Sequence, residues 1–173
     1  ATWNGTQAGA LSILWSGAIG GFGGNGVDLV LTGTQTGSVT LNNTANSSQM
    51  GLNGISIASG AGAFTLGGAT GSPIVTFRTG AVGGGTLNPL LLNNSANTAT
   101  IKSNVTFNSG SGASRALNFD GSGNWQVDNA LVTPNGGALT VIKNGAGTLT
   151  ITNANVSQNN GYTVNAGTLV VGG

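Results

Sequence analysis

Short bursts of alternating apolar and polar residues recur along the whole chain and predict β-strands. Apolar residues at every second position indicate a strand with one buried face, and here they alternate with Thr, Ser and Asn. Glycine interrupts the chain every few residues, which disfavours helix, and Gly, Asn or Ser turns follow the bursts. The clearest bursts are SVTL, GISI, AFTL, IVTF, NVTF, ALNF, LTVI and TLTI. The pattern therefore predicts an all-β protein with no substantial helix.

The bursts are related to one another, because a five-residue pattern recurs along the chain. It consists of glycine, a small residue, an apolar residue, Thr or Val, and a second apolar residue, and its copies begin at Gly37, Gly62, Gly137, Gly147 and Gly167. The first offset, 25 residues, is within the range of solenoid repeats. A second repeat, LNNTANS at 41–47 and LNNSANT at 92–98, has an offset of 51 residues. The shorter later offsets, 10 and 20 residues, indicate that coils vary in length or that several strands share one coil.

These spacings predict a β-solenoid of about seven coils, with roughly 25 residues in each coil. In such a fold each strand pairs with the same strand of the next coil, and Val, Ile, Leu and Phe stack in a narrow core. Glycine and asparagine are expected at left-handed corners. Asparagines at equivalent corners can form ladders of side-chain amides along the axis. Asn42 and Asn43, with Asn93 and Asn94, are the candidates for such ladders.

The composition favours a surface protein and argues against several partners. Gly, Ser, Thr and Asn make up 92 of the 173 residues, whereas charged residues are only 4%, against about 25% in a typical soluble domain. A net charge of +1 provides no basic patch, so we expect no nucleic-acid partner. The apolar runs are too short for a transmembrane helix, and we expect no membrane insertion. Low charge with abundant Thr and Asn suggests a protein that is secreted and extracellular or displayed on the outer cell surface.

One stretch resembles a calcium site. Residues 23–31, GGNGVDLVL, fit the calcium-binding nonapeptide, with Asp28 as the ligand and Val30 as the core residue. Each calcium ion in that motif lies between successive turns, so a single copy lacks half of its site. A glycine-rich turn that leads into a strand explains the same residues. We favour the turn and expect no metal and no cofactor.

A second acidic segment, DGSGNWQVD at 120–128, has polar residues at alternating positions. A calcium loop would need glycine where Trp125 stands, so we favour a strand with Trp125 and Val127 facing inward. Asp120 and Asp128 are the only nearby pair of carboxyl groups, and on one face of one strand they would be too far apart for glycoside hydrolysis. The basic residues are scattered, and His and Cys are absent. We therefore expect no catalytic residues and no enzymatic activity.

Residues 144–173, NGAGTLTITNANVSQNNGYTVNAGTLVVGG, resemble the autotransporter-associated β-strand repeat, whose pattern runs GxGTLTLTGxNxYTGGTTVNAGTLxVG. The match covers Gly145, 147–151, Asn155, Gly161 and 163–171, and it breaks at 153–160. TWNG at 2–5 is similar to the start of passenger regions in that family. The resemblance implies a right-handed parallel β-helix that is exported to the cell surface. We expect a single solenoid domain over 1–173, with a cap-like N-terminal region (1–36), solenoid coils (37–143) and an autotransporter-type repeat coil (144–173).

The last strand-like segment is the most consensus-like part of the chain, and no polar capping coil follows it in the sequence. Solenoids need such caps to stay unpaired, and an open strand edge recruits another strand. We therefore expect a non-catalytic structural protein that assembles head to tail into a surface fibre or matrix. The self-assembly strand would be Gly167, Thr168, Leu169, Val170, Val171 and Gly172, paired with an N-terminal element of the next copy such as 10–15. Surface glycans or a neighbouring cell surface are further candidate partners.

An alternative explains the same sequence. The chain could be a passenger fragment of a larger autotransporter-like adhesin that continues past Gly173. In that case the next strand would come from the same polypeptide.

Overall fold

A computed structural model describes residues 2–3, 11–15, 27–31, 39–43, 50–67, 75–78, 81–82, 85–86, 88–102, 105–108, 115–128, 139–153 and 159–172. These residues form strands, turns and extended segments, and no helix occurs among them. The predicted all-β class is therefore confirmed. Within the described part of the chain there is accordingly no helix that could cross a membrane.

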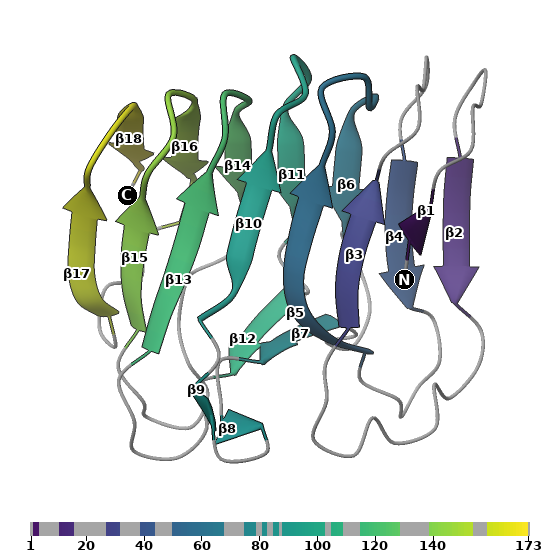
Figure 1. Ribbon diagram of the computed structural model, residues 1–173, viewed down its shortest axis with the longest axis horizontal. Coiled ribbons are helices and arrows are strands. Elements are labelled where there is room, and N and C mark those ends of the chain that lie inside the picture. The colour runs from purple at the N-terminus through teal and green to yellow at the C-terminus, as the bar shows by residue number, and fades with distance from the viewer. Residues whose placement is uncertain are drawn as a thin grey trace.

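Most strands belong to two long parallel ladders, which we call sheet 1 and sheet 2 (Figure 1). The main path of sheet 1 is β1 (Thr2–Trp3), β3 (Val27–Leu31), β5 (Met50–Ile57), β10 (Leu90–Asn93), β13 (Arg115–Asp120), β15 (Leu139–Lys143) and β17 (Asn159–Val164). Sheet 2 contains β2 (Leu11–Trp15), β4 (Val39–Asn43), β6 (Phe64–Leu66), β11 (Ala99–Ile101), β14 (Trp125–Val127), β16 (Thr148–Ile151) and β18 (Thr168–Val171). Every pairing within these two paths is parallel.

The chain builds both sheets by alternating between them. A strand of sheet 1 is followed along the chain by a strand of sheet 2, and the next such unit stacks beside the first; we call each unit a rung. Strands that are neighbours in a sheet are therefore separated along the chain by a strand of the other sheet. Parallel strands need such crossover connections, and this arrangement is solenoid-like.

The register shows that rungs differ in length. Ile55 pairs with Leu91, 36 residues further on, whereas Leu149 pairs with Leu169, only 20 residues further on. The pattern copies that begin at Gly137 and Gly147 supply β15 and β16, the two strands of one rung. Both explanations of the irregular offsets are thus confirmed, because coil length varies and two strands share one coil.

The seven-residue repeat does not mark equivalent positions, contrary to our expectation. Its first copy enters β4 of sheet 2, with Leu41 beside Leu66, whereas its second copy begins in β10 of sheet 1, with Leu92 beside Asp120. The two copies therefore occupy different sheets. Alternation and turn residues are the same in both sheets, so a local match cannot distinguish them.

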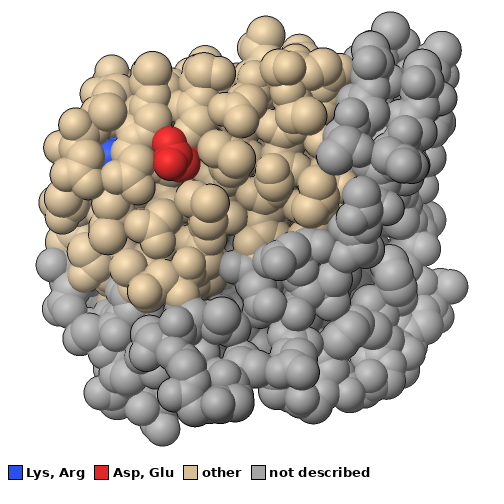
Figure 2. All heavy atoms as spheres, viewed as in Figure 1, with Lys and Arg blue, Asp and Glu red and all other residues tan. Residues whose placement is uncertain are grey.

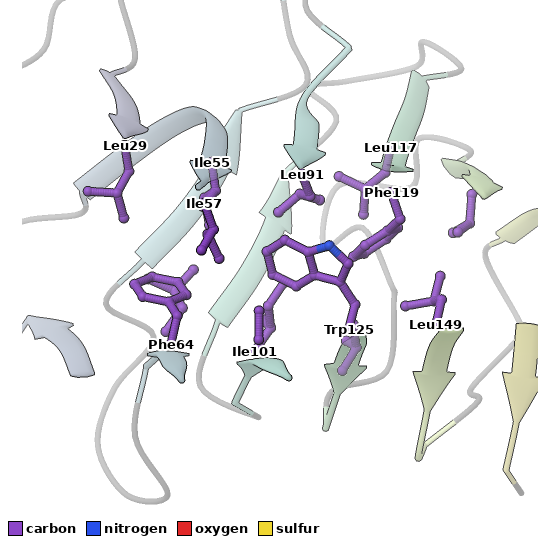
Figure 3. Packing of buried hydrophobic residues seen from close by; sticks show 14 of the residues in the cluster. Leu29, Ile55, Ile57, Phe64, Leu91, Ile101, Leu117, Phe119, Trp125 and Leu149 are labelled. Carbon is purple, nitrogen blue, oxygen red and sulfur yellow. The ribbon is translucent and has the colours of Figure 1, made fainter. Parts of the chain in front are cut away.

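Inward-facing apolar residues of the two sheets meet in a narrow core (Figure 3). Phe119 and Trp125, from two strands of one rung, contact each other edge to face with ring centroids 5.8 Å apart. Trp125 is 1% exposed, and the predicted inward direction of Trp125 and Val127 is confirmed. The other buried apolar residues are Leu29, Leu31, Ile55, Ile57, Ala61, Phe64, Leu66, Leu91, Ala99, Ile101, Leu117, Leu139, Val141, Leu149 and Ile151.

The remaining strands lie outside the two main paths. β7 (Val75–Arg78) pairs with the first half of β5 and with β12 (Val105–Asn108), both in parallel. β8 (Ala81–Val82) and β9 (Gly85–Thr86) form a short antiparallel pair. Figure 1 shows these strands below the main part of sheet 1. β7, β8 and β9 enlarge the segment between β6 and β10, which explains the long rung there, whereas β12 lies between β11 and β13.

Candidate self-assembly site

The predicted self-assembly segment, 167–172, consists of β18 with the residue before it and the residue after it. One edge of β18 pairs with β16, with Thr168 beside Thr148 and Val171 beside Ile151. The Gly172 amide extends this pairing by donating a hydrogen bond to the Ile151 carbonyl at 2.8 Å. Among the described strands, none pairs with the opposite edge of β18 or of β17. The final rung therefore presents one edge of each sheet.

The apolar layer of this final rung is open to solvent. Val171 is 42% exposed and Val164 is 48% exposed. The residues beside them one rung earlier, Ile151 and Lys143, are 0% and 1% exposed. Tyr162 and Leu169 of the same rung pack partly against the core. The inward positions of the last rung thus lack the layer that covers every equivalent position in the rung before it.

The turn between β17 and β18 is held by close stacking on the turn of the previous rung. Gly167 has a φ of +74°, and a Cβ atom there would lie 2.4 Å from the carbonyl oxygens of Gly145 and Gly147. The Asn165 side chain donates a hydrogen bond to the Asn144 side-chain oxygen at 2.8 Å. Only glycine fits this backbone conformation and this space. Stacked turns therefore fix the position of β18.

Left-handed turn positions were predicted for glycine and asparagine, and among the described residues only glycines adopt them. In the described residues, positive φ values occur only at Gly67, Gly121, Gly161 and Gly167. Asparagines contribute through their side chains, because Asn93 Nδ2 donates to the Asn124 carbonyl and Asn124 Oδ1 accepts from the Thr148 amide.

The amide ladder also differs from the one that we expected. Among the described residues, a side-chain amide pair joins Asn144 and Asn165. Asn93 is fully buried and its amide group bonds to main-chain carbonyls. The side chains of Asn42 and Asn43 lie outside the described residues.

Lys143 is the residue that our sequence analysis overlooked. It occupies an inward position between Phe119 and Val164 in sheet 1, and its side chain is almost completely buried. Its ammonium group donates hydrogen bonds to the carbonyl oxygens of Asn144, at 3.3 Å, and Gly145. Burial lowers the pKa of Lys143, and the negative charge of Asp120 opposes that change. The burst LTVIK contained the signal, because alternation from Leu139 and Val141 puts Lys143 on the same face.

The two aspartates do not lie on one strand, contrary to our expectation. Asp120 ends β13, and a turn separates it from β14, after which Asp128 follows directly. Asp120 Oδ1 accepts hydrogen bonds from the amides of Gly121 at 2.6 Å and Gly145 at 2.9 Å. It therefore fastens one turn to the next. The turn residues DGSGN were a stronger signal than the alternation that we extended across them.

Asp128 belongs to a separate polar cluster on the outer side of sheet 2. It forms an ion pair with Lys102 at 2.7 Å and accepts a hydrogen bond from Gln126 at 2.7 Å. Burial alone would raise the pKa of Asp128, but the hydrogen bonds and the charge of Lys102 outweigh it and lower the pKa. Lys102 and Asp128 follow neighbouring strands, so this pair also joins successive rungs.

The calcium candidate lies within a strand. Asp28 is in β3 beside Gly54, and its side chain lies outside the described residues. Leu29 and Leu31 are buried, whereas Val30 is only half-buried, so the motif's assignment of Val30 to the core is wrong. The described side chains include no group of three or more His, Cys, Asp or Glu residues that could hold a metal ion.

The described part of one face of the molecule carries few charged groups. In the described part of the face in Figure 2, a single patch of acidic atoms and a trace of basic atoms interrupt an otherwise uncharged surface. Comparisons with protein-family models, curated proteins and solved structures find no match to this chain. The candidate site must therefore be interpreted from its own geometry.

Proposed function

We propose that this chain is a non-catalytic extracellular structural protein whose copies join end to end into a surface fibre or matrix. Its fold would be a right-handed parallel β-helix of about seven coils. The seven strands in each main path support that number. Right-handedness is supported by the strong preference of parallel crossover connections for that hand and by the resemblance of 144–173 to the autotransporter-associated repeat. The low charge and the abundance of Thr and Asn support an exported protein.

The open final rung is the observation that carries this proposal. Val164 and Val171 are nearly half exposed, although the equivalent residues one rung earlier are buried. Completing the burial of each valine would contribute roughly 1 kcal/mol, since full burial of such a side chain contributes about 1.5–3 kcal/mol. Neighbouring strands would also pair with the main-chain groups at the outer edges of β17 and β18. Contacts of this heterologous kind generate open filaments.

Charge substitutions on β18 test the proposal. Val171→Lys puts a charge in the inward layer of the final rung, and we expect it to abolish assembly. Val170→Lys is the matched control, because Val170 is the adjacent residue, is 47% exposed and stands beside the outward-facing Thr150. Sedimentation velocity over a range of concentrations, with negative-stain imaging, measures assembly. Short monodisperse rods from the unmodified chain at every concentration would exclude end-to-end assembly.

A second candidate function is a passenger segment of a larger autotransporter-like adhesin. The resemblance of the last thirty residues to a repeat that occurs in such passengers favours it. The layer over Val164 and Val171 would then be a further rung of the same polypeptide. The mass of the natural protein distinguishes the two, because the adhesin requires a chain longer than 173 residues.

A further inference from the structure

The two outer strands of sheet 2 have matching residues in register. β2 lies at one edge of this sheet and β18 lies at the other. Following the pairing from strand to strand connects Leu11 to Leu169, Ser12 to Val170 and Ile13 to Val171. The first column contains Leu11, Val39, Phe64, Ala99, Trp125, Leu149 and Leu169; the last contains Ile13, Leu41, Leu66, Ile101, Val127, Ile151 and Val171.

The column between these two has a different character. It contains Ser12, Thr40, Thr65, Thr100, Gln126, Thr150 and Val170, and it is polar at every position except the last. The described Thr and Gln residues of this column are half-buried, whereas the described residues of the flanking columns up to β16 are buried. Apolar, polar and apolar columns thus run from one edge of sheet 2 to the other.

We propose that the open end binds the first rung of a second copy in the register that continues these columns. Leu11 of the second copy lies beside Leu169, Ser12 beside Val170 and Ile13 beside Val171. This inference rests on the end-to-end assembly proposed above and specifies its geometry. The strands of each sheet all run in one direction, so the free edge of β18 meets the free edge of β2 in the same parallel sense as every pair within the sheet.

Other registers match the columns less well. A slip of one residue would place Ser12 in an apolar column and both apolar neighbours on the outer face. A slip of two residues would retain the alternation but would take each strand out of the register that the pairings within its own sheet continue. The strands of the two sheets run in opposite directions (Figure 1), so the same movement shifts their registers in opposite senses.

The edge strands lack the features that usually prevent such docking. Proteins protect exposed strand edges with charged residues or proline. The sequences of the four edge strands, TW, LSILW, NNGYTV and TLVV, contain neither. A second copy of this chain is therefore an occupant that both ends accept.

Disulfide formation between two variants tests the register, because these 173 residues contain no cysteine. Ser12→Cys is mixed with Val170→Cys under oxidising conditions, and non-reducing intact-mass measurement identifies the heterodimer. In the proposed register the two Cα atoms are about 4.8 Å apart, within the range that a disulfide can bridge. The control, Leu14→Cys with Val170→Cys, is two residues out of register, which separates the Cα atoms by about 8 Å, beyond that range.

The inference predicts that the Ser12→Cys mixture yields at least about tenfold more heterodimer than the Leu14→Cys mixture, because only the first pair lies within disulfide reach. Sedimentation of the reduced single variants verifies that each still folds and assembles. Equal or reversed yields with assembly intact would overturn the register and leave the proposed function standing. Absence of both assembly and heterodimer would overturn the proposed function and this inference together.

Discussion

Replacing Gly147 by alanine tests whether stacked turns, in addition to the strands, hold successive rungs together. Gly147 is buried in the turn before β16, and a Cβ atom there would lie 2.0 Å from the carbonyl oxygen of Gly123 in the previous rung. The Gly123 turn is itself fixed, since the Gly123 amide donates to the Asn93 carbonyl at 2.8 Å. The added methyl group must therefore displace backbone atoms that are tied to a third rung.

The magnitude follows from two opposing effects. Forcing an extra methyl group into a tightly packed site costs about 1–3 kcal/mol. Alanine also reduces the entropy of the unfolded chain, which returns about 0.4–1 kcal/mol. We expect a net loss of about 1–2 kcal/mol, which lowers the melting temperature of a chain of this length by roughly 2–8 °C.

Denaturant titration followed by tryptophan fluorescence measures this loss, because Trp125 is buried in the core. Gly172→Ala is the matched control, since a Cβ atom at Gly172 would have its nearest contact at 3.3 Å. Its free energy of unfolding should change by only a few tenths of a kcal/mol. Equal unfolding midpoints for the two variants would refute the idea that turn stacking constrains the rungs.

Two further predictions concern buried or paired charges. Lys143→Met should change the free energy of unfolding near neutral pH by no more than about 1 kcal/mol, because removal of a buried ammonium is offset by loss of its hydrogen bonds to the carbonyls of Asn144 and Gly145. Burial lowers the pKa of Lys143 below 10.5, so the unfolded state binds more protons between the folded-state pKa and 10.5. Wild-type stability should rise with pH through that window, as denaturant titrations at several pH values would show, and a slope that persists in Lys143→Met would contradict this. Asp128 has a folded-state pKa below 3.8, so wild-type stability should fall as the pH drops from 3.8 through that pKa. Asp128→Asn should remove this fall, which amounts to at most about 1 kcal/mol for a partly exposed pair, and an unchanged acid profile would contradict the prediction.

Strands that are specified by their own residues could be predicted from the sequence. β4, β6, β16 and β18 each coincide with a copy of the glycine-containing pattern, because a turn residue followed by alternation specifies a strand whatever its neighbours are. Which strands pair with one another was harder to predict. Asn42 and Asn93 are in similar heptapeptides but in different sheets, and nothing within seven residues records which sheet a strand joins.

The position of the candidate self-assembly site could be predicted from the sequence, but the contacts and burial of its residues could be predicted only in part. β18 was expected as an open strand. That Val171 is exposed while Ile151 is buried could not be predicted, because it depends on which strand pairs with β18. Lys143 was classed with the scattered charges, and a lysine is rarely fully buried. The turn over Lys143 changes this, since it supplies two carbonyl acceptors to the ammonium group. These acceptors are main-chain carbonyls whose positions depend on the backbone conformation, so the residue types do not reveal them.

Lys143 also bears on whether a further rung can stack on the final one. An inward-pointing charge on an edge strand is one of the devices that prevent further strands from pairing. In this chain β17 pairs directly with the strand that carries Lys143, and the ammonium group is satisfied by turn carbonyls. Lys143 therefore does not stop stacking, because the carbonyl oxygens of the turn that follows it accept hydrogen bonds from its ammonium group. The final rung has no comparable charge, because its inward residues are Tyr162, Val164, Leu169 and Val171. In the assembly proposed above, a rung added over these four residues would therefore meet no buried charge.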